Sequence, residues 1–222
     1  MGFKLTWLGH AAWLLESEEI RVLIDPFITG NPSSRVKADE LNKIDYIAVT
    51  HNHSDHLGDT VRISNRTGAK VISMFENINM MFKDGLKQEN GIGMNKGGEL
   101  VDVGKIKVAL VQAVHSGNEC GVVIELGGKI IYHAGDTAFF SDMSLIGKQF
   151  NIDIAMLPIG GYFTMGPKQA AEAAAVLKAK IVIPMHYNTF PQISQDPNSF
   201  VNALNRAGQK GIVALPGKPI EL

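Results

Sequence analysis

The stretch Thr50-His-Asn-His-Ser-Asp-His56 decides how this chain is interpreted. It follows the pattern H-x-H-x-D-H and places four potential metal ligands within six consecutive positions: His51, His53, Asp55 and His56. Imidazole and carboxylate groups suit a divalent ion such as zinc or manganese. A polar loop that only caps the next helix has no structural need for four such side chains at this spacing. The motif therefore predicts a metal site.

The residues just before the motif indicate where this site lies in the fold. Residues 45–50 form an apolar run, Asp-Tyr-Ile-Ala-Val-Thr, that is typical of a buried strand. The four ligands would then occupy the loop at the carboxyl end of that strand. Open α/β folds commonly place their chemistry at this edge of the sheet.

Three further potential ligands also follow predicted strands. His115 comes after the apolar run 108–114, and His186 comes after the run 181–185. Asp136 lies in the segment Tyr-His-Ala-Gly-Asp-Thr at 132–137, just beyond another strand. Histidines distributed at random along the chain would not be expected to follow predicted strands in this way, at one edge of a layered fold. The repetition therefore indicates that these side chains converge on the site of the motif.

The pattern along the chain predicts an α/β protein with two strand-rich stretches, each followed by helices. No break in composition marks a linker, so we expect a single domain over residues 1–222. We expect the two βα halves to pack sheet against sheet with helices outside. The predicted strands are 3–8, 11–16, 20–25, 45–50, 70–74, 99–103, 105–114, 121–125, 129–132, 152–157, 181–184 and 211–215. The predicted helices are 59–65, 76–86, 167–179 and 197–207.

Composition excludes several classes of protein. The 222 residues are 45% hydrophobic and 19% charged, with a formal net charge of −1 and no block of five like charges, so no nucleic-acid partner is expected. No apolar run approaches the ~18 residues that span a bilayer, and no secretion signal opens the chain, so no membrane association is expected. Cys120 is the single cysteine. The simplest expectation is a cytoplasmic protein without a disulfide.

These motifs resemble the metallo-β-lactamase superfamily. The resemblance is carried by H-x-H-x-D-H, the later strand-end histidines and the Gly-Asp-Thr loop. It extends over essentially all of the chain, including Leu-Gly-His at 8–10, Leu-Ile-Asp-Pro at 23–26, Gly-Tyr-Phe-Thr-Met-Gly at 161–166 and Pro-Met-His-Tyr at 184–187. These sequence segments are similar to those of a branch of metal-dependent hydrolases that is close to the ascorbate-phosphate lactonases. The resemblance implies the four-layer αββα sandwich of that superfamily.

The resemblance also implies a set of ligands for two divalent metal ions. Zinc is the first expectation, while manganese, nickel or iron would also suit these ligands. Asp25 matches an early aspartate that orients a ligand from outside the coordination sphere, although it can also be read as a strand terminator before Pro26. By position, the first metal would be held by His51, His53 and His115, the second by Asp55, His56 and His186, and both would be bridged by Asp136.

The implied activity is hydrolysis of a small ester-like substrate, either a lactone or a phosphodiester. In this scheme a hydroxide that bridges the metals attacks the substrate, and Asp55 and Asp136 are catalytic as well as ligands. His10 follows a turn near the expected cleft. Two roles are open for it: a catalytic one, by contact with the substrate or assistance as an acid, and a structural one. His133 is interpreted as a core histidine or an outer partner of the metal site.

Other functions have less support from the sequence. The main alternative is a dioxygenase that uses a single iron ion and acts on sulfur compounds or persulfides. A non-enzymatic metal-dependent sensor has less support, because the ligand set is complete. Diiron relatives carry a carboxylate at the position of His53, which argues against redox chemistry. The expected partner is a small-molecule substrate. Exposed sheet edges and a small domain are compatible with a homo-oligomer.

Overall fold

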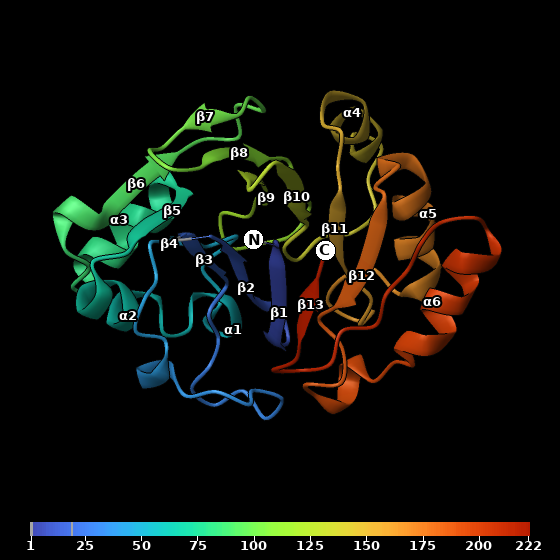
Figure 1. The fold of residues 1–222 in the computed structure, drawn as a ribbon, viewed down its shortest axis with the longest axis horizontal. Helices are drawn as coiled ribbons and strands as arrows, with labels where there is room; N and C mark the ends of the chain where they lie inside the picture. Colours follow the sequence, from blue (N-terminus) through green and yellow to red (C-terminus); the bar gives the residue numbers. More distant parts are fainter. Residues whose placement is uncertain (1, 19) are drawn as a thin grey trace. The chain divides into compact units, whose positions relative to one another are not determined.

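The computed structural model describes residues 2–18 and 20–222. The chain forms two compact units, each built around one β-sheet (Figure 1). Among the described residues, no helix has the length and apolar character needed to cross a bilayer. Unit 1 comprises Met1–Gly97, Ser116–Glu119 and Leu215–Leu222, and unit 2 comprises Gly98–His115 and Cys120–Ala214.

The sheet of unit 1 has the order β13-β1-β2-β3-β4-β5-β6. Strands β13, β1, β2 and β3 pair antiparallel, whereas β3, β4, β5 and β6 pair parallel. The parallel part matters most for function, because it aligns the carboxyl ends of its strands along one edge. The strands are β1 (Lys4–Gly9), β2 (Ala12–Ser17), β3 (Ile20–Ile24), β4 (Tyr46–Ala48), β5 (Lys70–Met74), β6 (Gly91–Met94) and β13 (Pro219–Glu221).

Helices cover this sheet through short apolar faces. The helices of unit 1 are α1 (Ser54–Leu57), α2 (Thr60–Thr67) and α3 (Phe75–Lys83), with the 3-10 turns η1 (Ala38–Glu40) and η2 (Gln88–Asn90). Helices α2 and α3 both pack on β5. Ile63 of α2 and Ile78 and Met81 of α3 are buried in a core that also contains Ile47 and Val71 of the sheet. Because Ile78 and Met81 are three positions apart, they lie on the same face of α3.

Unit 2 repeats the same plan with the order β12-β11-β10-β9-β8-β7. Strands β7 to β10 pair antiparallel, and β10, β11 and β12 pair parallel. Each unit therefore joins an antiparallel meander to parallel strands, as expected for two βα halves. The strands are β7 (Val101–Asp102), β8 (Lys107–Val111), β9 (Gly121–Leu126), β10 (Lys129–His133), β11 (Ile154–Pro158) and β12 (Ile181–Met185).

The helices of unit 2 lie beside its parallel strands. They are α4 (Met143–Gln149), α5 (Pro167–Leu177) and α6 (Pro197–Arg206), with the turn η3 (Pro191–Ile193). Helix α5 packs on β11 and α6 on β12, and the two helices lie side by side (Figure 1). Proline at the first turn starts α5, and its buried side chains recur at helical spacing. These are Ala170, Ala173, Ala174 and Leu177.

Three sequence-based expectations are wrong in detail. The predicted strand 211–215 is a single bridge between Gly211 and Val182, because the chain then leaves β12 and its last residues pair with β1 as β13. The predicted strand 105–114 ends at Val111, since Val114 bonds instead to the loop after β10. The predicted helix 59–65 is α2 and begins at Thr60, because the carboxylate of Asp59 accepts bonds from the backbone N–H and hydroxyl of Thr29 and makes no capping hydrogen bond to the helix.

Asp153 ties the three parallel strands of unit 2 together, and we predict that Asp153→Asn lowers stability. Its carboxylate accepts bonds from Ile130 N and Lys180 Nζ, both at 2.8 Å. Burial of the carboxyl opposes ionisation, but Lys180 and the Ile130 N–H outweigh it and hold the pKa of Asp153 below its usual value of 3.8. We expect the substitution to reduce the free energy of unfolding in urea by about 1–2 kcal/mol at neutral pH.

The pH dependence of the free energy of unfolding provides a second test with Asp153→Asn. Because the folded-state pKa is lowered, the stabilisation is present above the usual pKa and is lost as the pH falls through the folded value. The difference between wild type and variant should therefore shrink in acid. Glu125→Gln is the control, since its exposed ion pair with Lys107 contributes only about 0–1 kcal/mol. Equal stability of wild type and Asp153→Asn at neutral pH would contradict the assignment.

Candidate metal centre

In unit 1 the site begins where two parallel strands end. Asp25 directly follows β3, and Thr50 and His51 follow its neighbour β4. Asp25 adopts a left-handed backbone (φ 44°), which Asp tolerates better than most residues. Its amide donates to Ala48 O at 3.0 Å, so this turn is fixed against β4.

The carboxylate of Asp25 is fully buried and accepts three short hydrogen bonds. Oδ1 accepts from Thr50 N at 2.8 Å. Oδ2 accepts from Thr50 Oγ1 at 2.6 Å and lies 2.7 Å from His56 Nδ1. An ionised carboxylate only accepts hydrogen bonds, so His56 Nδ1 carries a proton and donates it. Nε2 of His56 is then the nitrogen that offers a lone pair to a metal, as in carboxylate–histidine–metal arrangements.

The same aspartate fixes the tautomer of His51 through Thr50. The hydroxyl proton of Thr50 is directed at Asp25, so Thr50 Oγ1 accepts from His51 Nδ1, which lies 3.0 Å away. His51 Nε2 therefore holds a lone pair, and it lies 3.1 Å from His53 Nδ1. One buried carboxylate thus orients two of the four ligands in the motif.

His53 has its own partner from a distant part of the sequence. Its Nε2 lies 3.3 Å from the hydroxyl of Ser116, which also belongs to unit 1. The backbone N–H of Asn52 donates to Gly117 O at 3.0 Å and holds this segment beside the motif. This arrangement directs His53 Nδ1 toward His51.

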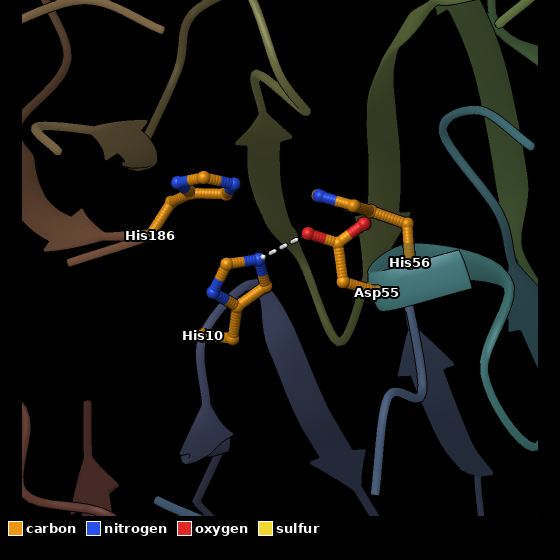
Figure 2. Close-up of side chains that lie close together, drawn as sticks. All are labelled: His10, Asp55, His56 and His186. Atoms are coloured by element: carbon orange, nitrogen blue, oxygen red, sulfur yellow. Dashed lines mark hydrogen bonds and ion pairs between the residues drawn. The ribbon is translucent and has the colours of Figure 1, made fainter. Parts of the chain in front are cut away.

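The second part of the motif gathers with His10. Potential ligand atoms of His10, Asp55 and His56 all lie within 4.8 Å of one another. Figure 2 shows the His10 ring facing the carboxylate of Asp55, with His56 beside it. His10 Nε2 lies 3.2 Å from Asp55 Oδ2. Helix α1 is only four residues long, but it brings Asp55 and His56 forward from its first turn.

Unit 2 brings together its own three predicted ligands. Asp136 Oδ2 lies 3.0 Å from His186 Nε2 and 3.6 Å from His115 Nε2. All three residues follow strand ends, as the sequence indicated, although His115 and Asp136 lie several residues beyond β8 and β10. Asp136 and His186 are buried, and His115 is partly buried.

Backbone contacts hold the two loops of unit 2 together. Val114 N donates to Thr137 Oγ1 at 3.0 Å, and Ala138 N donates to Val114 O at 3.0 Å. His133 is buried at the end of β10, and its Nδ1 accepts from Gly135 N at 3.1 Å. His133 therefore shapes the turn that carries Asp136.

His186 occupies a tight turn after β12. Its backbone is left-handed (φ 54°), and a Cβ at Gly160 would clash with His186 O and approach Ile193 Cβ at 2.9 Å. Only glycine allows the two backbones to approach so closely. Burial raises the pKa of the neighbouring Tyr187 to about 12, so its phenol stays protonated at neutral pH.

The donor atoms suit divalent metal ions in chemistry and spacing. Two atoms that bind one tetrahedral zinc ion at about 2.0–2.1 Å lie roughly 3.3 Å from each other. The 3.1 Å between His51 Nε2 and His53 Nδ1 and the 3.0 Å between His186 Nε2 and Asp136 Oδ2 are close to this value. Nitrogen and carboxylate donors at these distances are what zinc or manganese requires.

Three supporting residues were not identified from the sequence. Thr50 links Asp25 to His51, Ser116 contacts His53, and Thr137 bonds to the segment before His115. Each directly precedes or follows a predicted ligand, which is the one signal that could have identified it. Serine and threonine are common in loops, so a position next to a predicted ligand does not by itself predict such a contact.

Comparison with known proteins defines the family. The model of the beta-lactamase superfamily domain matches residues 4–186, which include every predicted ligand. The chain belongs to the beta-lactamase superfamily. It is 52% identical over 206 residues to a UPF0173 metal-dependent hydrolase of Caldivirga maquilingensis, covering 91% of this chain and 89% of the relative. The predicted resemblance is therefore confirmed.

Solved structures confirm the predicted fold as well. Igni18, described as a metallo hydrolase from Ignicoccus hospitalis, matches with a TM-score of 0.93 and 38% identity, covering 100% of this chain and 99% of its own. YhfI of Bacillus subtilis, described as a metallo-beta-lactamase fold protein, matches with a TM-score of 0.78 over 100% of both chains. At 15% identity the second match shows the fold alone. The fold is the metallo-β-lactamase fold, the αββα class that the sequence indicated.

We predict that Asp25→Asn weakens metal binding about 10–100-fold without unfolding the protein. Asn keeps the size of the side chain but lacks the charge that orients His56 and, through Thr50, His51. Competition with a chromophoric chelator measures the affinity, and circular dichroism monitors the fold. Asp45→Asn is the matched control, because Asp45 accepts a bond from Arg21 N at the exposed, opposite end of β4. Unchanged affinity in Asp25→Asn would show that this aspartate does not orient the ligands.

Proposed function

We propose that the protein is a hydrolase that binds two divalent metal ions. The proposed first metal is held by His51, His53 and His115. The proposed second metal is held by Asp55, His56 and His186, and Asp136 bridges the pair. The observation that carries the proposal is the preorganised donor set of the motif, in which Asp25 fixes His51 and His56 so that Nε2 of each offers a lone pair to a metal.

The chain places His115 directly beside a residue that contacts His53. His115 is joined by a peptide bond to Ser116, and the hydroxyl of Ser116 lies 3.3 Å from His53 Nε2. A short, fixed tether of this kind supports binding of His115 and His53 to the same ion.

The position of Asp136 supports the bridging role. A single carboxylate oxygen, Oδ2, lies 3.0 Å from His186 Nε2 and 3.6 Å from His115 Nε2. These histidines are assigned to different metals, so an oxygen near both is suited to contact both ions. His133 contributes by fixing the Gly135 turn that precedes Asp136.

The proposed reaction is cleavage of a small ester-like substrate, a lactone or a phosphodiester. When bound, two divalent ions lower the pKa of a water and polarise the substrate oxygen, so hydrolysis needs no side-chain nucleophile. The chain's own carboxylates and imidazoles hold the ligand geometry, and the proposed further role of Asp55 is to accept a hydrogen bond from the nucleophile. The names of the relatives support this class, since Igni18 is described as a metallo hydrolase and the Caldivirga protein as a metal-dependent hydrolase. We also propose a small molecule as the substrate.

We expect about two equivalents of zinc, manganese or nickel per chain in protein purified without chelator. Elemental analysis measures the content, and hydrolysis of bis-p-nitrophenyl phosphate and of a simple lactone measures the activity. Activity should disappear with chelator and return with metal. A single iron with oxygen consumption and no hydrolysis would favour a dioxygenase. Absence of bound metal would contradict the proposal.

Asp136→Ala should remove hydrolysis and weaken binding of one metal while the fold remains intact. The loss should exceed the roughly 10–100-fold effect expected for a partner outside the coordination sphere, because a direct ligand is removed. Asp142→Asn is the control, since this exposed carboxylate accepts a bond from Ser141 and lies outside the ligand set. Wild-type turnover in Asp136→Ala would remove the bridging assignment.

A further inference from the structure

His10 has an unusual backbone for a buried residue. It lies between β1 and β2 with φ 57°, directly after Gly9 with φ 99°. A Cβ at Gly9 would approach Ser33 Cβ at 2.8 Å, so glycine is required there. Trp7 Nε1 donates to His10 O at 2.9 Å and holds the turn. A left-handed non-glycine residue is strained and persists where the surroundings determine it.

The ring of His10 is as constrained as its backbone. The side chain is fully buried. Its ring meets Phe27 nearly edge-on, with centroids 5.9 Å apart, and lies 5.4 Å from the ring of His56. This packing aims Nε2 at Asp55 Oδ2, 3.2 Å away, as the dashed line in Figure 2 marks. The two residues are 45 positions apart, so the contact depends on the tertiary fold.

We propose that His10 is a positioning residue that orients the carboxylate of Asp55 toward the second metal. The inference rests on the proposed dinuclear centre. His10 Nε2–H donates to Oδ2 and selects the rotamer in which Oδ1 is the oxygen presented to the ion. Carboxylate ligands in metal sites are commonly oriented by such hydrogen bonds. The strained turn at Gly9 and His10 then serves to place this donor.

Direct coordination by His10 is the competing interpretation, because its ligand atom lies within 4.8 Å of those of Asp55 and His56. Catalytic zinc sites, however, commonly use three protein ligands and leave a position open for water or substrate. Asp55, His56 and His186, together with the bridging Asp136, already provide the ligands proposed for the second metal. These are already four protein ligands, so His10 as a fifth would leave a five-coordinate ion no position for water or substrate.

The experiment compares three variants of the full-length protein by cobalt binding. His10→Asn tolerates the left-handed backbone, but its amide is one bond nearer the backbone and does not reach Asp55. His10→Gln extends further and restores an N–H donor. Leu15→Val is the control for lost packing, since it shortens a fully buried side chain of the same hairpin. Chelator competition gives the affinity for each Co²⁺ equivalent, and visible absorption reports the ligand set at saturation.

We expect His10→Asn to weaken one Co²⁺ equivalent by about 10–100-fold and to leave the other unchanged. The saturated spectrum should match wild type, and His10→Gln should recover most of the affinity. Leu15→Val should lower the unfolding midpoint without changing either affinity. The inference would be overturned if His10→Asn left both Co²⁺ affinities unchanged. It would also be overturned if the spectrum of the saturated variant differed from wild type and His10→Gln did not restore it. A wild type that binds fewer than two equivalents would instead overturn the dinuclear centre, and the role of His10 with it.

Discussion

The hydrogen bonds of the buried Asp25 carboxylate are the interaction on which the candidate metal site of unit 1 depends. The carboxylate connects the end of β3 to the end of β4 through Thr50 and to helix α1 through His56. A buried charge is tolerated only when its hydrogen bonds are satisfied, and here the partners are the residues that carry the ligands. Stability of the turn and orientation of the imidazoles therefore have the same physical cause. Removal of the charge would affect both.

The topology of each sheet explains why ligands accumulate at strand ends. Both units join antiparallel strands to parallel ones, and parallel strands bring their carboxyl ends to a common edge. Turns at that edge must leave the sheet abruptly, which accounts for the left-handed backbones of Asp25 and His186. Strain at these positions is offset by hydrogen bonds and close packing around them. The local strain is a consequence of placing polar side chains where strands end.

The fold and the ligand set together limit the chemistry more than either does alone. The metallo-β-lactamase fold by itself hosts many functions, since function resides in the site and not in the architecture. The motif around His51 and His53 adds donors suited to a Lewis-acidic ion. Substrate preference depends instead on the groups around that centre, and the metal ligands carry little information about it.

The sequence alone determined the fold class and most of the strands and helices, and it predicted the type of site. It could do so because H-x-H-x-D-H is a local pattern and hydrophobic periodicity is a local property. It also indicated His115, Asp136 and His186 from their positions after apolar runs. It failed at 211–215, where the run resembles a strand but the chain leaves β12 and its last residues pair with β1.

Only the tertiary structure decided how the ligands are oriented. The contacts of Asp25 with His56, of Ser116 with His53 and of His10 with Asp55 join residues that are 31, 63 and 45 positions apart. No local pattern encodes such pairs, because hydrogen-bond geometry depends on distances of a few ångströms between separate elements. The sequence specifies which donor atoms are available. Folding decides which nitrogen of each imidazole, and which oxygen of each carboxylate, is presented for binding.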